Sequence, residues 1–255
     1  MRTIRDGVAG LAVLAALAFG ACAPAAEAAE VKVIAANAVK DGYAALIAGF
    51  EATSGHKVVT TWAGTVAATK KVMDGEVYDL VLIGSANIDQ LVAAGKLAAG
   101  SRVDFAKTGV AMAVRAGLAK PDISTPDAVK AAVLAAKSVA HSAGPSGAYV
   151  AELLKKMGIA EKVASRIKQP SSGAEVAKLI ASGEADLGFA QVSEFLGVSG
   201  LVDLGSLPAA IQNYTIYAIG LHAAAPAADA AKALVKHLTA PAAAPAIKKM
   251  GMEPG

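Results

Sequence analysis

Short apolar runs alternate with helical stretches from residue 31 to residue 95, and this alternation constrains the fold more than any other feature of the chain. The apolar runs cover residues 31–36, 57–62 and 78–83, and each has the length of a buried strand. The helical stretches that follow them cover residues 38–50, 66–73 and 88–94. Strands joined through single helices pair in parallel. We therefore predict an α/β fold, with helices on both faces of a mainly parallel sheet.

Small polar residues follow each of these strands, namely Asn37, Gly64 with Thr65, and Ser85. Parallel strands place their carboxyl ends together, so these residues are expected at one edge of the sheet. Asn37 is a suitable N-cap for the first helix, because its side-chain oxygen can accept from a free N–H of the first turn. Such helix starts bind anions through unpaired N–H groups, although Asn37 by itself is equally explained as a cap alone.

A second unit of the same kind is expected after Gly109. Gly144-Pro145-Ser146-Gly147 leads from a short strand into a helix, so Ser146 and the N–H of Gly147 are expected to face a cleft. A later strand ends at Gln191. The remaining strands are predicted at residues 110–114, 187–190 and 212–221, and the remaining helices at residues 148–157, 174–181, 227–238 and 242–250.

The N-terminus has the pattern of a secretory signal peptide. Arg2 and Arg5 precede an uncharged apolar run at residues 8–21, and Ala26-Glu27-Ala28 supplies a small-x-small cleavage site. We assign residues 1–28 to the signal peptide and expect a periplasmic protein. Cys22, the only cysteine, offers the alternative of lipid attachment, and the rest of the chain must fold without disulfides.

Several classes of function are excluded by what the chain lacks. The net charge is only +3 and no basic run is interleaved with aromatic residues, so nucleic acid is not an expected partner. The four histidines are scattered without ligand spacing, which argues against a metal site. Neither a Walker loop nor a dinucleotide fingerprint is present, and we expect no cofactor.

The sequence around Ser146 leaves one enzymatic alternative open. Residues 144–148 nearly match the G-x-S-x-G nucleophile elbow, with Ala148 in place of the last glycine, and His141 lies nearby. A triad also requires a histidine with its own orienting carboxylate, and nothing in the sequence marks one. A secreted hydrolase that uses Ser146 is therefore the alternative to a non-enzymatic binding protein.

The segments named above, taken in order, resemble the molybdate-binding-protein-like (type II) periplasmic solute-binding proteins of bacterial ABC importers. The segments that carry the resemblance are residues 31–38, 60–65, 78–83, 145–147, 183–191 and 251–254. The resemblance implies a two-lobed fold with two crossover strands and a solute held between the lobes. We expect lobe 1 at residues 31–109 plus 214–255 and lobe 2 at residues 110–213. A monomer is expected to deliver a small anion to a permease in the inner membrane.

The resemblance also implies which residues contact the solute. They are Asn37, Ala38, Gly64, Thr65, Ser146, Gly147, Gly173 and Gln191. Relatives that bind molybdate usually carry serines at the first two sites and a tyrosine at the position of Gln191. Because hydrogen-bond donors are matched to a buried ligand group by group, these departures leave two ligand classes open: a molybdate-like oxyanion or a small organic acid.

The two ligand classes would make different use of Arg115. It ends a predicted crossover strand, where its guanidinium could reach the cleft and hold a carboxylate with two hydrogen bonds. Glycine at positions 64 and 173 would then leave room for the larger body of an organic acid. In the other interpretation Arg115 is a solvated charge at the end of a strand, and neutral donors alone hold a tetrahedral oxyanion.

Overall fold

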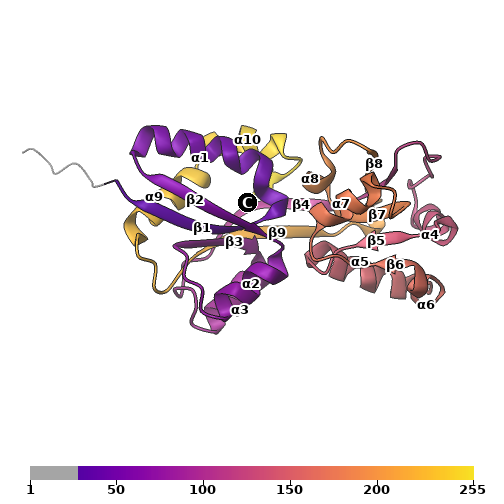
Figure 1. The fold of residues 1–255 in the computed structure, drawn as a ribbon, viewed down its shortest axis with the longest axis horizontal. Coiled ribbons are helices and arrows are strands. Elements are labelled where there is room, and N and C mark those ends of the chain that lie inside the picture. Colours follow the sequence, from indigo (N-terminus) through magenta and orange to yellow (C-terminus); the bar gives the residue numbers. More distant parts are fainter. Residues whose placement is uncertain (1–27) are drawn as a thin grey trace, which may run out of the picture.

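A computed structural model describes residues 28–255, which form two lobes side by side (Figure 1). The predicted signal peptide, apart from Ala28, and Cys22 lie outside the described residues. Each lobe is a sheet flanked by helices, so the predicted two-lobed α/β fold is confirmed. None of the helices between residues 28 and 255 is long and apolar enough to cross a membrane.

Lobe 1 contains the three parallel strands that the sequence predicts. β1 pairs in parallel with both β2 and β3, while β9 pairs antiparallel with β3 and continues the sheet to β4. The elements of this lobe are β1 (Glu30–Ala36), η1 (Asn37–Val39), α1 (Lys40–Ser54), β2 (Lys57–Ala63), α2 (Thr65–Met73), β3 (Leu80–Gly84), α3 (Ser85–Ala93), β9 (Tyr214–Leu221), α9 (Ala228–Leu238), η4 (Pro241–Ala243), α10 (Ala244–Lys249) and β10 (Glu253–Pro254).

The buried carboxylate of Asp79 connects distant segments of this lobe. Its two oxygens accept hydrogen bonds from the N–H groups of Lys32 on β1 and Ala227 before α9, at 2.8 and 2.6 Å. The helix α1 packs against α9 and α10 and buries Tyr43 and Phe50 at helical spacing. Distant parts of the chain therefore share one core, which extends from residue 31 to 106 and from 217 to 252.

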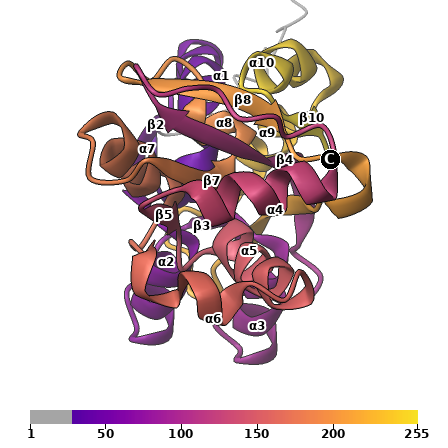
Figure 2. The same cartoon turned by 90° about the vertical axis from the view of Figure 1, so that its right-hand side faces the viewer.

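Lobe 2, which faces the viewer in Figure 2, is also a sheet flanked by helices. β5 pairs in parallel with β6 and β7, and the second half of β4 pairs antiparallel with β7 and β8. The elements of this lobe are α4 (Pro126–Ala135), β5 (Val139–His141), α5 (Pro145–Lys156), α6 (Ala160–Val163), η2 (Ala164–Arg166), β6 (Ile167–Lys168), α7 (Gly173–Ala181), β7 (Leu187–Gln191), α8 (Val192–Phe195), β8 (Leu201–Ser206) and η3 (Ala209–Ile211).

The strand β4 (Val103–Arg115) runs through both lobes. Its first half pairs with β9 as far as Gly109, and from Val110 onward it pairs with β7. The amide of Gln212 supports the passage, because it accepts from the N–H of Val110 and donates to its carbonyl, at 2.8 and 3.0 Å. The sequence predicts only the second half of β4, at residues 110–114, because Asp104 and Lys107 interrupt the apolar pattern of the first half.

Helices begin closer to the strand ends than the sequence indicates. Ser85, Ser146 and Gly173 each lie inside the first turn of a helix rather than in the loop before it. The prediction that Asn37 caps the first helix is wrong. A 3-10 turn at Asn37–Val39 precedes α1, its cap is Ala36, and no side chain accepts a capping hydrogen bond there. The side chain of Asn37 is thus not used as a cap.

Candidate functional site

The starts of several helices meet between the two lobes. From lobe 1 come η1 and α2, and from lobe 2 come α5 and α7, each directly after a strand or a short loop. Their first residues enclose a small cavity, here called the inner pocket. It is lined by Ala36, Asn37, Ala38, Gly64, Thr65, Ser142, Gly144, Pro145, Ser146, Ser171, Ser172, Glu194 and Tyr217. The structure therefore brings together Asn37, Ala38, Gly64, Thr65 and Ser146 from the predicted contact set.

The lobes touch at this pocket. A Cβ atom on Gly64 of lobe 1 would lie 2.7 Å from the carbonyl oxygen of Ser171 in lobe 2. A Cβ atom on Gly84 would lie 3.2 Å from the ring of Pro145. The inner pocket has a volume of about 20 Å³, which is room for roughly one water molecule. The predicted free space beside Gly64 is absent, because the Ser171 carbonyl fills it.

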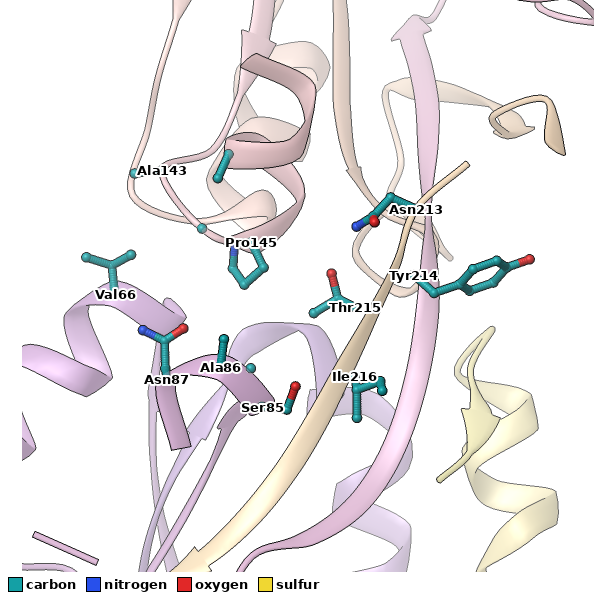
Figure 3. A pocket seen from close by; sticks show the side chains of 13 residues that line it. Val66, Ser85, Ala86, Asn87, Ala143, Pro145, Asn213, Tyr214, Thr215 and Ile216 are labelled. Carbon is teal, nitrogen blue, oxygen red and sulfur yellow. The ribbon is translucent and has the colours of Figure 1, made fainter. Parts of the chain in front are cut away.

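A larger cavity, here called the wide pocket, adjoins the inner pocket through Gly144 and Pro145 (Figure 3). It has a volume of about 420 Å³ and lies between the start of α3, the start of α5 and the crossover strand β9. Polar groups come from Ser85, Asn87, Asn213 and Thr215, and the Tyr214 ring points away from the cavity. The remaining lining residues are Val66, Gly84, Ala86, Ala143, Gly144, Pro145, Ala148 and Ile216.

Glu194 places a carboxylate in the inner pocket. Its Oε1 accepts from the N–H of Ala174 at 3.1 Å, and its Oε2 accepts from the N–H of Gln191 at 3.3 Å. The first of these donors belongs to the N-terminal turn of α7, where a bound anion would be favoured. The carboxylate can lie there only because position 173 is glycine, since a Cβ atom would lie 1.9 Å from Oε2 of Glu194. The predicted room beside Gly173 is therefore filled by the carboxylate of this chain itself.

Burial raises the pKa of Glu194 from 4.5 to about 7, although backbone N–H groups of Gln191, Ala174 and Gly173 act in the opposite direction. By its overall exposure Glu194 is half-buried, and it lines the inner pocket. Tyr217 on β9 lines the same pocket, and burial together with the charge of Glu194 raises the pKa of its hydroxyl. Tyr217 therefore remains a neutral hydrogen-bond donor at ordinary pH.

Gly147 and Gln191 do not line the inner pocket but hold the elements around it in place. A Cβ atom on Gly147 would lie 1.6 Å from the carbonyl oxygen of Ser142, so only glycine lets α5 start so close to the end of β5. The amide of Gln191 is buried against both crossover strands. In the orientation that satisfies both of its ends, its nitrogen donates to the carbonyls of Thr108 and Gly109 at 3.3 and 3.1 Å. Its oxygen accepts from the Thr215 hydroxyl at 2.7 Å. Gln191 thus joins the lobes and is not among the lining residues.

Arg115 does not reach the cleft. It lies at the end of β4 beyond Val114, which pairs with Leu187 at the start of β7, whereas Gln191 pairs with Val110 at the other end. Its guanidinium lies 3.7 Å from the carboxylate of Asp186 and its side chain is 41% exposed. Arg115 is thus not among the residues brought together at either pocket, and its place fits the interpretation of a solvated charge at the end of a strand better than that of a carboxylate anchor. A one-dimensional pattern could not show which end of the strand faces the other lobe.

The side chains around Ser146 do not have the geometry of a hydrolase active site. Ser146 is buried in the first turn of α5, and Nδ1 of His141 lies 3.2 Å from the carbonyl oxygen of Ser142 instead of contacting Ser146. Burial lowers the pKa of His141, so the imidazole is neutral. Among residues 28–255, no cluster of histidine, cysteine or carboxylate side chains has the arrangement of a metal site.

Sequence reasoning missed Glu194, Tyr217, Asn213 and Thr215. The last three lie on or beside β9, whose place between the lobes is a property of the tertiary fold. One local signal pointed to Glu194. It lies three residues after Gln191, which is the spacing of a capping box, and its side chain accepts from the Gln191 N–H as that motif requires.

Comparison with known proteins places this geometry in a family. The profile of the bacterial extracellular solute-binding proteins matches residues 31–253. An aconitate isomerase from Pseudomonas sp is 36% identical over 188 residues, covering 74% of this chain and 72% of the relative. The molybdate-binding protein ModA of Azotobacter vinelandii is 28% identical over 216 residues, covering 79% of this chain and 81% of the relative.

Solved structures agree with this fold. The periplasmic molybdate-binding protein of Azotobacter vinelandii superposes with a TM-score of 0.75 at 21% identity, covering 87% of this chain and 98% of that one. The sulfate-binding protein SubI of Mycobacterium tuberculosis H37Rv gives a TM-score of 0.72 at 21% identity, covering 89% and 87%. The resemblance expected from the sequence is thus confirmed, and the chain belongs to the bacterial extracellular solute-binding proteins.

Proposed function

We propose that this protein captures a small organic carboxylate between its lobes and delivers it, as a periplasmic monomer, to the permease of an ABC importer. Membership of the solute-binding family supports capture and delivery. Relatives and structural neighbours named for molybdate, sulfate and aconitate support an anion as the solute. The choice of a carboxylate depends on the details of the cleft.

The observation that carries this choice is the contact of Glu194 with the start of α7. A tetrahedral oxyanion without a proton needs donors on every side, and the Ala174 N–H already donates to the Glu194 carboxylate. A dianionic oxyanion in the inner pocket would also place both of its charges beside that carboxylate, and like charges repel strongly at short range in a buried site. An organic acid can instead keep most of its charge in the adjoining wide pocket. The volume of about 20 Å³ leaves no space for any anion while the lobes touch, so a ligand group enters the inner pocket only as the lobes separate.

The wide pocket suits the body of an organic acid. It offers amide and hydroxyl groups from Asn87, Asn213 and Ser85, next to apolar surface from Val66 and Ile216. The N-terminal turns of α3 and α5 border it, and both favour negative charge. No lysine or arginine is found among the described residues that line either pocket. Helix starts and neutral donors would therefore hold the carboxylate.

Calorimetric titration of the purified protein tests this proposal. The panel comprises acetate, succinate, citrate, cis-aconitate and trans-aconitate, with molybdate, tungstate, sulfate and phosphate as the competing class. We expect at least one carboxylate to bind in the micromolar range or tighter, at about −8 kcal/mol or below. Binding of molybdate or sulfate alone would overturn the choice of a carboxylate and keep the oxyanion alternative.

A second candidate function is isomerisation of a bound unsaturated acid. The relative named aconitate isomerase suggests it, and Glu194 is the observation that favours it. A carboxyl group with a pKa of about 7 inside a cleft can both remove and return a proton near neutral pH. Incubating the protein with cis-aconitate in deuterated water and following the two isomers by proton NMR tests this function. Isomerisation that Glu194→Gln abolishes would establish it, and unchanged substrate at saturation would exclude it.

A further inference from the structure

Glu194 fills the place that a ligand would use at α7. Its carboxylate accepts from the backbone N–H groups of Ala174 and Gln191, and no lysine or arginine of residues 28–255 forms an ion pair with it. An anionic group that enters the inner pocket as the lobes separate therefore meets either a second negative charge or a neutral carboxyl group. Only the second case is favourable, because the unfavourable Coulomb energy is large where water is excluded.

We propose that Glu194 couples anion capture to the uptake of one proton. This inference rests on the proposed function. When an anion enters, the Glu194 carboxylate takes a proton from solvent, one O–H bond forms, and the neutral carboxyl group donates that O–H to the ligand. The added proton therefore cancels one negative charge of the bound ligand.

The surroundings of Glu194 support a single titrating group. The elements that pack against α8 are β4, β7, β8, α7 and η1, and β9 contributes Tyr217 to the same pocket. Tyr217 is the titratable neighbour whose own pKa responds to the charge of Glu194. The other charged groups on these elements or just beside them are exposed or held in ion pairs: Lys40, Asp104, Lys107, Arg115, Glu175, Lys178, Asp186 and Asp203.

The geometry also limits which ligands fit. A carboxyl O–H needs an acceptor on the ligand, which every carboxylate offers. With Glu194 ionised, the same site instead needs a ligand that carries a donor of its own. Both ligand classes satisfy the first condition and both lose the Ala174 N–H to Glu194, but the loss matters more for a tetrahedral oxyanion, which needs donors on every side. Glu194 is thus expected to set both the pH dependence of binding and the preference between the ligand classes.

Calorimetry with trans-aconitate as the probe tests the coupling. Titrations at pH 8 in two buffers of different ionisation enthalpy measure the protons taken up on binding. We expect close to one proton per ligand, and a dissociation constant that rises up to about tenfold per pH unit above pH 7. Glu194→Gln should remove the uptake and make the dissociation constant independent of pH between 6 and 8.5. Glu184→Gln, which changes an exposed glutamate beyond α7, should behave as the wild type.

Binding without proton uptake at pH 8 would overturn the coupling even though the proposed function stands. Where trans-aconitate does not bind, carbon-13 NMR titration of the glutamate carboxyl groups in the ligand-free protein decides the matter, with Glu194→Gln identifying the signal. A Glu194 carboxyl that titrates near pH 7 supports its role as the proton carrier although the probe has failed. Titration below pH 5 overturns the coupling.

Discussion

Glu194 Oε1 and the backbone N–H of Ala174 lie 3.1 Å apart, so a side chain from α8 occupies the anion-binding end of α7. The Glu194 carboxylate thus occupies a position in the cleft where a bound anion would otherwise lie. It also explains why position 173 is glycine, since a Cβ atom there would collide with the carboxylate. A ligand must therefore be accommodated beside Glu194 or in place of it.

The stability of the ligand-free protein should depend on pH through Glu194. Its pKa rises from 4.5 to about 7 on folding, so folding favours the protonated form. The stability gained from protonation is fully present below pH 4.5 and is lost as the pH rises to 7. Relative to Glu194→Gln, the unfolding free energy of the wild type should fall by up to about 3 kcal/mol across this window. Urea titrations at several pH values measure it, and parallel curves for the two proteins would contradict it.

Gly173→Ala should destabilise the protein and disturb the cleft together. The added Cβ would lie 1.9 Å from Oε2 of Glu194, so the carboxylate must leave the start of α7. We expect a loss of about 1–3 kcal/mol, as for other overpacked sites, and weaker binding. Gly49→Ala is the matched control on α1, where the nearest atom is 3.7 Å away, and it should be neutral or slightly stabilising. Equal effects of the two changes would count against the contact.

Gly64→Ala should act on closure of the lobes rather than on folding. Gly64 has extended backbone angles that alanine also adopts, with φ −68° and ψ 151°. In the closed arrangement, however, its Cβ would lie 2.7 Å from the Ser171 carbonyl oxygen of the other lobe. We expect an unchanged melting temperature and an affinity reduced by about tenfold or more, because the closed state is less populated. Solution scattering should show less ligand-induced compaction, and compaction equal to that of the wild type would exclude this role.

Gln191→Met should weaken the connection between the lobes. The change keeps the size of the side chain, but it leaves the Thr215 hydroxyl and the carbonyls of Thr108 and Gly109 without the buried amide. Unpaired buried polar groups cost about 1–3 kcal/mol. Denaturant unfolding measures the loss. A stability within experimental error of the wild type would show that the amide has no structural role there.

The sequence predicts where helices start better than it predicts which groups each helix start binds. Asn37 and Thr65 follow two paired parallel strands, so their meeting at one edge of the lobe 1 sheet follows from parallel pairing. Ser146 follows β5 in lobe 2 and meets them only because the two lobes face each other. Arg115 was misplaced because strand polarity relative to the other lobe depends on how β4 passes between two sheets. Glu194 was missed because it lies on a four-residue helix whose importance comes from contacts with α7.

The dissociation constants of carboxylates and molybdate, measured calorimetrically side by side at pH 6, test the central claim most directly. At this pH most of Glu194 is protonated, so the cleft can donate to a carboxylate without charge repulsion. We predict that the tightest carboxylate of the panel binds at least about 100-fold more tightly than molybdate, a difference of about 2.7 kcal/mol. Molybdate bound more tightly than every carboxylate would contradict the account.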